Sequence, residues 1–439
     1  MGFSAIKSPR SENTLTVATE QCRRGMRPKT VAILGTLDTK GEEFAYLRTR
    51  IESAGLATLV IDSGILGEPA FDPAISRWEL AKAGRHPLED LLDTRDRGES
   101  IAAMAAGAAV VVRQLFEEGR IHGLISLGGS AGTTIGTAAM RSLPAGFPKV
   151  MVSTLASGDT RPYVGTKDIV MVHSVVDIAG LNLLSRRILA NAAAAIAGMV
   201  LQEETGGREM SKPLVAATMF GVTTPCVTIA RRILEERGFE VLVFHATGAG
   251  GQAMENLIAD GYVAGVLDVT TTELADELAG GVMSAGPHRL EAAAEKGIPQ
   301  VVCPGAIDMV NFGPLDSVPE KYRKRLLHVH NPNVTLMRTT PEECAELGRI
   351  TAEKLNRARS SVVFLMPLRG VSAIDAAGLS FWWPQADRCY LDALKANLNA
   401  RIRLVEVDAH INDEGYARAA ADTLLKLLNE SVVDGAHAV

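Results

Sequence analysis

The feature that most constrains the fold is a regular alternation of short apolar segments with longer, helix-like ones. The short segments are rich in Val, Ile and Leu, and they lack the alternating polarity of a strand with one exposed face. In the first half they occupy residues 30–35, 57–62, 122–127, 149–153 and 168–173. Buried strands separated by helices are typical of parallel sheets with helices on both faces. The sequence therefore predicts an α/β protein.

The alternation starts again after a polar, glycine-containing stretch at residues 202–212. The strand-like segments of this second half are residues 213–221, 240–246, 265–269, 299–303, 326–330, 361–366 and 401–407. Both halves open with a strand, a threonine-containing turn and a helix, which indicates a weak internal duplication. We therefore expect two similar α/β domains, each a parallel sheet with helices on both faces. The predicted boundaries are a flexible tail at 1–29, a first domain at 30–205 and a second domain at 206–439, and the motifs below suggest what each binds.

Composition excludes several classes of protein. The 439 residues carry a net charge of −6 without a basic block, which argues against a nucleic-acid-binding protein. The five cysteines include no CxxC pair, which favours a reducing cytoplasm over a disulfide scaffold. The longest apolar runs, 101–112 and 188–201, fall short of the roughly 20 residues of a membrane span, so we interpret them as buried helices. The polar, proline-containing connection at 63–97 is too long for an ordinary loop and predicts a lid or binding loop.

The first candidate binding site is the turn between a strand and a helix at 125–140. Its glycines would let backbone amides approach an anion, and a helix N-terminus adds unsatisfied N–H groups and partial positive charge. The residues concerned are Gly128, Gly129, Ser130, Gly132 and Thr133. A plain tight turn with a capping hydroxyl is the alternative, but it would need only one glycine and one hydroxyl. We therefore predict a phosphate or carboxylate ligand here.

A second candidate follows the first strand, at 31–44. Gly35 loosens this turn, while Asp38 and Lys40 place opposite charges beside it. Lys40 could neutralise a phosphate, and Asp38 could hold Mg²⁺. The alternative is that Asp38 or Thr39 merely caps the following helix. The spacing of a Walker A loop is absent from the chain.

Two further loops carry weaker signals. The loop at 153–169 gathers hydroxyl groups with Ser153 and Asp159, although a solvated loop explains it equally well. In the second half, Gly248, Gly250 and Gly251 fit a GxGxxG/A pattern between a strand and a helix. That pattern follows the second strand of its half instead of the first. It therefore predicts anion or substrate binding more than a dinucleotide.

Ionisable side chains near strand ends in the second half suggest acid–base chemistry. The candidate catalytic residues are His245, Asp268, His288 and Asp308. Such groups facing one crevice are what general acid–base catalysis requires, although each alone could be a helix cap or a satisfied core group. Candidate substrate contacts are Thr224, Thr271 and Arg369, together with the three glycines of the 248–251 loop. The spacings typical of zinc sites are missing.

Several segments together resemble the Tm-one-like ATP-binding domain family, a bacterial and fungal group related to the N-terminal region of a tomato virus-resistance protein. The resembling segments are residues 35–44, 125–133, 153–165, 220–225, 246–255, 267–274, 288–312, 330–340 and 369–387. They span nearly the whole chain, and their combination is specific although no single one is. The plant protein's extra C-terminal region has no counterpart here. We therefore do not expect this chain to share the plant protein's binding to a viral replication enzyme.

The resemblance implies two Rossmann-like domains, a homodimer, and ATP with Mg²⁺ bound by the first domain. The nucleotide role then falls on the matching residues Gly35, Thr36, Asp38, Lys40, Gly128, Gly129, Ser130, Gly132 and Thr133. Asp38 is the expected metal ligand. Family membership itself supplies no reaction.

These expectations combine into three hypotheses. The first is a cytoplasmic Mg-ATP-binding protein, an enzyme acting on a small acidic metabolite at a cleft between its two domains. The second is a cofactor-free hydrolase, lyase or isomerase with its site in the second domain. The third is a nucleotide-responsive binding module without turnover. In each case the partner is a small molecule, and neither nucleic acid nor membrane is involved.

Overall fold

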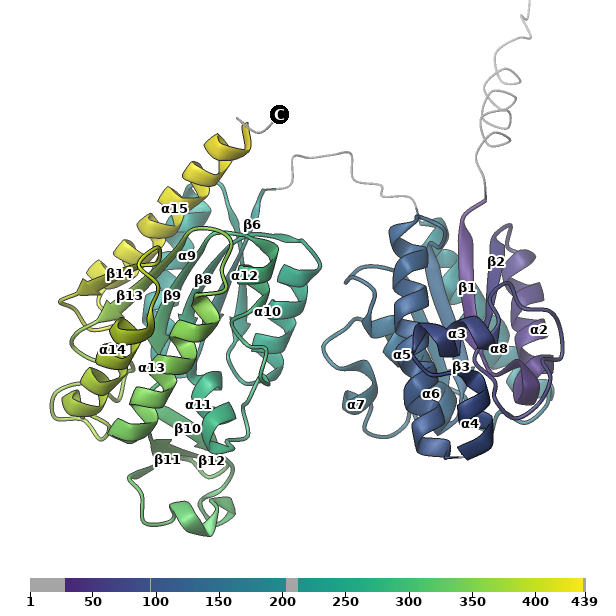
Figure 1. Ribbon diagram of the computed structural model, residues 1–439, viewed down its shortest axis with the longest axis horizontal. Helices are drawn as coiled ribbons and strands as arrows, with labels where there is room; N and C mark the ends of the chain where they lie inside the picture. Colours follow the sequence, from purple (N-terminus) through teal and green to yellow (C-terminus); the bar gives the residue numbers. More distant parts are fainter. Residues whose placement is uncertain (1–27, 95, 203–211, 437–439) are drawn as a thin grey trace, which may run out of the picture. The chain divides into compact units, whose positions relative to one another are not determined.

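The structure is a computed structural model that divides into two compact units (Figure 1). The units are Met1–Thr205 and Gly206–Val439. Residues 28–94, 96–202 and 212–436 are described. Most of the predicted tail at 1–29, and most of the polar stretch predicted as the domain boundary, lie outside these described residues.

The first unit contains one parallel sheet in the order β2-β1-β3-β4-β5. Its strands are β1 (Thr30–Gly35), β2 (Ala57–Asp62), β3 (Gly123–Gly128), β4 (Lys149–Ser153) and β5 (Val170–His173). The central strands β1 and β3 are almost entirely buried, as their continuous apolar sequences predict. The predicted Rossmann-like parallel sheet is thus confirmed for this unit.

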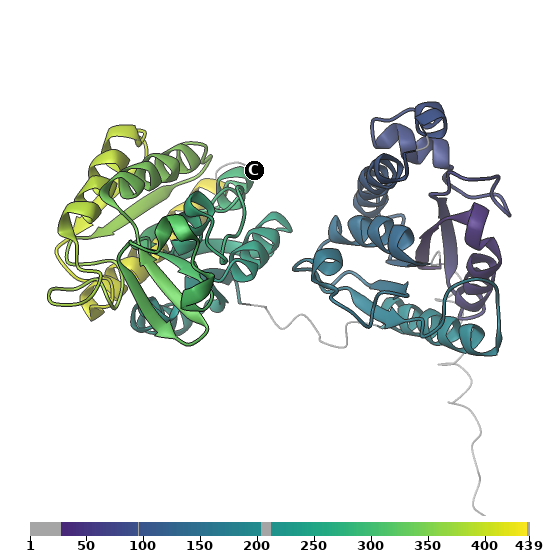
Figure 2. The ribbon, with the colours of Figure 1, turned by 90° about the horizontal axis from the view of Figure 1, so that it is seen from below.

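Helices cover both faces of this sheet (Figure 2). One face packs against α2 (Leu37–Glu52) and α8 (Leu183–Leu201). The other packs against α3 (Arg77–Ala83), α4 (Leu88–Thr94), α5 (Arg97–Glu117) and α6 (Ser130–Arg141). A short helix, α7 (Arg161–Val164), lies between β4 and β5. Each sheet face thus has its own apolar core, as a three-layer α/β unit requires.

The 63–97 connection, whose length predicts a lid or binding loop, is not one irregular loop. It contains α3 and α4, and a capping box between Ser76 and Glu79 begins α3. Leu80, Leu88 and Leu91 of these helices are buried in the core of the first unit. The polar residues and prolines of this segment obscured two short helices in the sequence.

Helices α5 and α8 are long and apolar enough to cross a membrane by length and composition alone. Each of them packs one side against the sheet of the first unit: Ala108 and Val112 of α5 are fully or almost fully buried, as are Ala192 and Ile196 of α8. Core packing therefore accounts for their apolar composition, as the sequence predicts.

The second unit contains a six-stranded parallel sheet in the order β14-β13-β9-β8-β6-β7. Its strands are β6 (Leu214–Met219), β7 (Glu240–His245), β8 (Val263–Thr270), β9 (Gln300–Gly305), β13 (Val362–Pro367) and β14 (Arg403–Val407). In the first sheet, β1 lies between β2 and β3, and in the second sheet, β6 lies between β7 and β8. In both units the first strand therefore lies between the second and the third. The two units therefore share one core topology.

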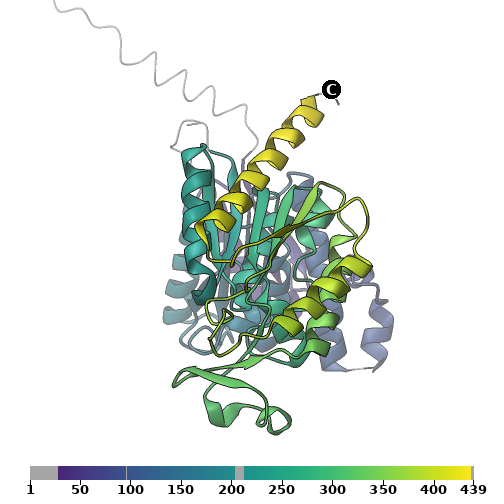
Figure 3. The same ribbon diagram turned by 90° about the vertical axis from the view of Figure 1, so that its left-hand side faces the viewer.

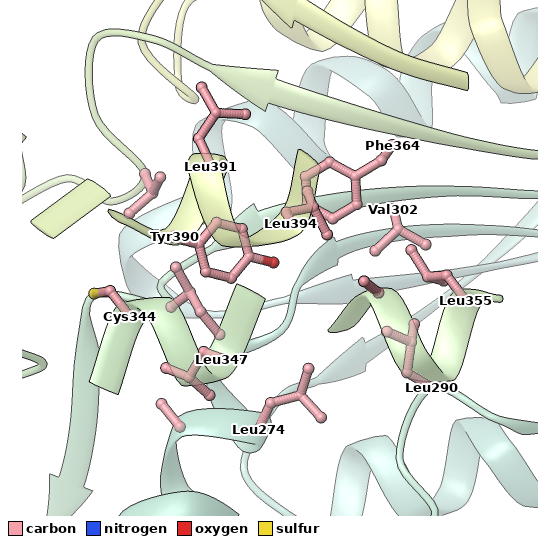
Figure 4. Packing of buried hydrophobic residues seen from close by; sticks show 14 of the residues in the cluster. Leu274, Leu290, Val302, Cys344, Leu347, Leu355, Phe364, Tyr390, Leu391 and Leu394 are labelled. Carbon is pink, nitrogen blue, oxygen red and sulfur yellow. The ribbon is translucent and has the colours of Figure 1, made fainter. Parts of the chain in front are cut away.

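Helices again cover both faces of the sheet. One face packs against α9 (Thr224–Glu236) and α15 (Glu414–Ala436). The other packs against α10 (Ala249–Ala259), α11 (Thr272–Ala279), α12 (Ala292–Lys296), α13 (Pro341–Leu355) and α14 (Pro384–Asn397). Figure 4 shows part of this second layer, where Phe364 of β13 and Tyr390 of α14 lie in one apolar cluster with Leu347 of α13.

The segment predicted as a strand at 326–330 is β11 (Leu327–Asn331), but it does not belong to the main sheet. It pairs antiparallel with β12 (Val334–Arg338), which also pairs with β10 (Met309–Phe312). This small sheet projects from one end of the second unit (Figure 3). Three short 3₁₀ turns complete the unit: η1 (Gly221–Thr223), η2 (Leu315–Ser317) and η3 (Glu320–Tyr322).

Candidate functional site

The first unit has a topological switch point between β1 and β3. These strands are neighbours, yet β1 leads into α2 on one sheet face and β3 leads into α6 on the other. Leu34 pairs with Ser126, so the bends that begin at Thr36 and Gly128 lie side by side at the carboxyl edge. Ligands of open α/β sheets bind in the crevice that such a divergence creates. This edge is therefore a candidate position for a ligand site.

The N-terminus of α6 is open. Its N-cap residue is Gly129, which has no side chain to cap the helix. The first amide to close a turn is that of Thr133, which donates to the Gly129 carbonyl at 2.8 Å. Within the described part of the chain, no hydrogen bond is donated by the amides of Ser130, Ala131 or Gly132. Three unsatisfied donors and the positive end of the helix dipole thus face an exposed position.

The other predicted groups at this bend serve the protein's own packing. A Cβ on Gly128 would lie 2.8 Å from the Gly132 Cα, so these two glycines allow the strand and helix to approach closely. Thr133 and Ser153 are fully buried, and their hydroxyl oxygens lie 2.7 Å apart. Ser153 also accepts from the Leu155 amide at 3.0 Å. The two hydroxyls position the β4 loop and are not exposed to a ligand.

The bend before α2 is already filled by a carboxylate of the protein. Asp62, at the end of β2, accepts from the Leu37 amide at 3.1 Å and the Gly64 amide at 2.9 Å through Oδ1. Burial raises the pKa of Asp62, and the nearby Asp38 carboxylate contributes in the same direction. An anion at the first turn of α2 would compete with Asp62.

Asp38 and Lys40 are held by nearby backbone. Oδ2 of Asp38 accepts from the Leu66 amide at 2.7 Å and the Gly67 amide at 3.2 Å. Oδ1 of Asp38 is buried without a hydrogen-bond partner. The Lys40 ammonium donates to the carbonyl of Ile178. Of these two side chains, Asp38 keeps one oxygen without a partner.

The remaining residues assigned to the cofactor have local roles. Gly35 allows the ring of Phe44 to pack against β1, since a Cβ there would lie 1.7 Å from the ring. Thr36 is the N-cap residue of α2 but makes no side-chain cap, and its hydroxyl accepts from Thr39. Asp159 is exposed and forms an ion pair with Arg161, which lowers its pKa to about 2.

In the second unit, the glycine-rich loop binds Glu273 of α11. The Gly248 and Gly251 amides donate to Oε1 of Glu273 at 2.7 and 3.1 Å. A Cβ on Gly250 would lie 1.8 Å from the His245 carbonyl oxygen, so this glycine permits tight strand–helix packing. The carboxylate of Glu273 therefore occupies the position that an anionic ligand of this loop would take.

Glu273 belongs to a buried charge cluster around Arg289. The guanidinium contacts Asp268 at 2.6 and 2.8 Å, Glu273 at 2.7 Å and Glu255 at 3.3 Å. Asp268 also accepts from the Thr218 hydroxyl at 2.6 Å. Arg289 is inaccessible to solvent. Every charge of the cluster has a partner, as buried charges require.

A second buried cluster surrounds Arg338 of β12. Its guanidinium lies 2.6 Å from Asp387 and 3.8 Å from Asp375. Asp308 accepts from the Ser372 hydroxyl at 2.8 Å, while its other oxygen has no partner. Burial and repulsion from Asp375 raise the pKa of Asp308 to about 8. Burial likewise raises the pKa of Asp387 to about 7.

The four candidate catalytic residues do not form one group. Asp268 and Asp308 are buried in the two separate clusters. His245 is exposed at the end of β7 and packs near Phe220, and His288 is exposed beside Glu291 at 2.9 Å. No hydrogen bond or ion pair of the described residues joins any two of the four. We therefore find no shared acid–base centre among them.

The candidate substrate contacts outside the glycine-rich loop are likewise engaged. The Thr224 hydroxyl donates to the Phe220 carbonyl, and the Thr271 hydroxyl donates to the Cys303 carbonyl. Arg369 forms a two-pronged pair with Asp408, at 2.7 and 2.8 Å, on the exposed surface. Of these three residues, Arg369 is exposed, Thr224 is half-buried and Thr271 is buried.

Sequence reasoning missed the carboxylates that fill the bends, Asp62 and Glu273, and the two buried arginines, Arg289 and Arg338. Asp62 had a usable signal, because it ends a predicted strand at the expected binding edge. Glu273 had none, since it reaches the Gly248 amide from 25 residues further along the chain.

The fold and the switch point at the carboxyl edge of the first sheet define a class of protein. Its members have two α/β units, each built on a parallel sheet of Rossmann-like topology. Family models then identify the chain. It matches the N-terminal domain of the uncharacterised protein family UPF0261 over residues 29–205 and the C-terminal domain over residues 212–428. The chain belongs to the UPF0261 family.

Relatives include a Clostridium tetani UPF0261 protein, 55% identical over 92% of this chain and all of that protein. A Rhizobium meliloti UPF0261 protein is 47% identical over 91% of this chain. The tomato ToMV resistance protein Tm-1(GCR237) is 42% identical, and the match covers 91% of this chain but 56% of the tomato protein. The family predicted from the sequence is thus confirmed.

Among solved structures, a UDP-N-acetylglucosamine 2-epimerase is similar. It is 12% identical to this chain, with a TM-score of 0.21, and the match covers 86% of this chain and 92% of that one. A likeness of this size carries no argument about function.

Proposed function

We propose that the first unit binds the phosphate groups of a nucleotide, ATP, at the open N-terminus of α6. One observation carries this proposal. Among the three glycine-containing bends predicted to bind anions, those before α2 and α10 hold the chain's own Asp62 and Glu273. Among the residues that the structure describes, no side chain bonds to the bend before α6, which presents three free amides. A phosphate is a suitable ligand for such a helix end.

Magnesium would accompany the nucleotide, and the chemistry of Asp38 fits it. One oxygen of Asp38 is buried without a partner, and Mg²⁺ is commonly bound by one or two carboxylates together with phosphates and water. When bound, the ion would neutralise phosphate charge. The residues of the chain itself would then hold the phosphates at the amides of Ser130, Ala131 and Gly132.

The reaction we propose is ATP-dependent activation of a small acidic metabolite by a cytoplasmic homodimer. Phosphoryl transfer depends chiefly on positioning and charge neutralisation, which an open helix end supplies. One observation favours a second candidate, a nucleotide-responsive binding module without turnover: the four predicted acid–base residues lie apart, and two of them are buried in separate charge clusters. The same observation gives no support to a cofactor-free enzyme in the second unit.

Calorimetric titration with ATP and Mg²⁺ tests the binding site. Gly129 has ordinary backbone angles and space for a side chain, so Gly129→Asp would place a carboxylate at the helix N-cap. We expect this variant to weaken ATP binding by at least about tenfold, since the carboxylate takes the amides and repels phosphate. Gly129→Ala is the matched control and should bind normally. Equal binding by wild type and Gly129→Asp would place the nucleotide elsewhere.

Turnover separates the two candidate functions. The measurement is release of ADP from Mg·ATP in the presence of a panel of small carboxylic acids. The enzyme predicts ADP release that depends on one acid and is lost in Gly129→Asp. The binding module predicts ATP binding with unchanged nucleotide throughout.

A further inference from the structure

We propose that residues 280–286 form a strap whose closure is controlled by a proton on Asp276: the strap stays closed while Asp276 is protonated and opens when Asp276 ionises. The strap follows α11 and leads to the segment before α12, and it lies over the glycine-rich loop of the second unit. It belongs to the second unit alone, so it does not depend on nucleotide binding by the first unit.

The strap packs directly on the glycine-rich loop. A Cβ on Gly248 would lie 2.7 Å from the Ser284 carbonyl oxygen and 3.3 Å from that of Met283. The Met283 side chain also packs against an apolar cluster that includes Phe220. The closed strap therefore covers the bend at which Glu273 binds the loop amides.

Glycines at both ends allow the strap to move. Gly280 has a φ of 77° and Gly286 a φ of 84°, both in the left-handed region that favours glycine. No atom lies within 4 Å of the Cβ position of either residue, so neighbouring groups do not restrain the backbone there. Between these two glycines, Val282 is exposed. Small residues at the ends of an element are a common form of hinge.

Asp276 of α11 fastens the strap to β10. Its Oδ1 atom accepts from the Met283 amide at 3.2 Å and the Asn311 amide at 3.0 Å, and its Oδ2 atom accepts from Asn311 Nδ2 at 2.6 Å. The Asn311 carbonyl accepts from the Val282 amide at 2.8 Å. A Cβ on Gly281 would lie 1.8 Å from Asp276 Oδ1, so the strap passes close to the carboxyl group. This buried group is thus at the centre of the contacts that hold the strap.

No cation balances the Asp276 carboxyl group. It is inaccessible to solvent, and no Lys, Arg or His side chain of the described residues bonds to it. One charged neighbour on α11 is Glu273, which repels Asp276 and is itself bound to Arg289. The other is the exposed Glu277, which accepts from the Ser284 hydroxyl. A buried carboxylate without a cation is unfavourable, so the closed strap favours the neutral acid.

Other titratable groups lie on the elements around α11. Helix α13 contributes Cys344 to the same apolar cluster as α11, and burial raises the pKa of its thiol to about 12. The turn η3 contributes Tyr322, whose hydroxyl donates to the Ala279 carbonyl at 3.1 Å. Beyond the strap, His288 is exposed and lies 2.9 Å from Glu291. None of these four side chains bonds to the strap in the described part of the chain, whereas Asp276 is both buried and bonded to it.

The pH range of the switch follows from the pKa of Asp276 in the closed and open strap. Burial raises this pKa to about 7 in the closed strap, the Asn311 hydrogen bonds offset part of the shift, and repulsion from Glu273 adds to it. In water an aspartate titrates near about 3.9, which applies to the open strap. The proton therefore stabilises closure fully below about pH 4, and this stabilisation is lost as the pH rises to about 7.

Asn311 can also serve the protonated form of Asp276. The Oδ1 atom of Asn311 is buried and has no hydrogen-bond partner, while its Nδ2 atom faces Asp276 at 2.6 Å and the Thr272 hydroxyl at 3.3 Å. If the amide group turns over, Oδ1 takes the place of Nδ2 and accepts the proton of the neutral carboxyl group. The buried O–H group then has the acceptor that it requires.

Amide hydrogen exchange of the full chain at pH 5 and pH 7.5 tests the strap. Exchange is expressed as a protection factor, which removes the ordinary effect of pH on the exchange rate. The amides of residues 281–283 are hydrogen-bonded in the closed strap. Their protection should fall at least about tenfold between the two pH values, while the amides of β8 keep theirs.

Three variants identify the group that titrates. Asp276→Asn puts a neutral group of the same shape in place of the acid, and its amide can donate to the unpaired oxygen of Asn311. Its strap should therefore stay protected at pH 7.5. Glu277→Gln and His288→Gln are the matched controls, because each removes an exposed titratable group beside the strap. Both should show the pH dependence of wild type.

Several outcomes would overturn the proton-controlled strap. Equal protection of residues 281–283 at both pH values in wild type would do so without any variant. A fall of the same size in β8 would mean general unfolding instead of strap opening. If folded Asp276→Asn protein keeps the pH dependence, or if either control variant loses it, another group titrates and Asp276 is not the switch.

Discussion

Three carboxyl groups around one guanidinium make the Arg338 cluster sensitive to pH. Burial and Asp375 raise the pKa of Asp308 to about 8, whereas an aspartate in an unfolded chain titrates near about 3.9. Between these values the folded protein keeps a proton that the unfolded chain releases. Stability should therefore fall as pH rises from about 4 to about 8.

Asp308→Asn should remove much of that dependence. The amide stands in for the protonated carboxyl group, so the variant should melt at a higher temperature than wild type at pH 8.5 and similarly at pH 5. Thermal unfolding followed by circular dichroism across this range checks it, with Asp72→Asn as the control. A wild-type protein that gains stability between pH 5 and pH 8, with no difference in Asp308→Asn, would contradict this assignment.

Glu273 gives a second residue-scale prediction. Glu273→Ala would leave the buried Arg289 short of a partner and free the Gly248 and Gly251 amides. Removing one member of a buried ion cluster typically costs about 3–5 kcal/mol. The exposed pair of Arg369 and Asp408 is the comparison, and Arg369→Ala should cost far less, because solvent screens an exposed ion pair. Urea unfolding measures both, and equal losses would refute the structural role of Glu273.

At this scale the sequence predicted where anions could bind but not which bends were already filled. Glycines and hydroxyls after a strand are local signals, so the turns at Gly35, Gly128 and Gly248 were found. Whether a carboxylate enters such a turn depends on side chains from other elements. Glu273 reaches the Gly248 amide across 25 residues, and no local pattern encodes that contact.

At the element scale, periodicity located most strands within a few residues. The buried strands of the two main sheets stand out because both their faces are covered, and their apolar runs are continuous. The antiparallel strands β10 and β12 were missed, since β10 is four residues long and directly follows β9 in the chain. Helices α3 and α4 were missed because each spans only seven residues, too few for a clear helical period.

The contact between β1 and α2 provides an element-scale prediction. Gly35→Ala would bring a methyl group within 1.7 Å of the Phe44 ring. Overpacking of this kind should destabilise the first unit by about 1–3 kcal/mol. Phe44→Leu in the same protein should recover part of the loss, because the smaller side chain leaves room. If Gly35→Ala is as stable as wild type, or if adding Phe44→Leu lowers the stability further, this packing account is wrong.

At the scale of the whole molecule, the two units share one core topology but differ in what fills the bends at the carboxyl edges of their sheets. In the second unit, charged side chains of the protein fill the glycine-rich loop and the strand ends beside it. In the first unit, the end of α6 stays open. The sequence predicted both units and their family, whereas this difference emerges only from packing. This difference is why we propose ligand binding for the first unit.

Amide hydrogen exchange with and without Mg·ATP tests this central claim most directly. The account predicts slower exchange at residues 129–133, no change in the 248–251 loop, and loss of the protection in Gly129→Asp. Protection that falls on the 248–251 loop, or that persists at 129–133 in Gly129→Asp, would contradict it.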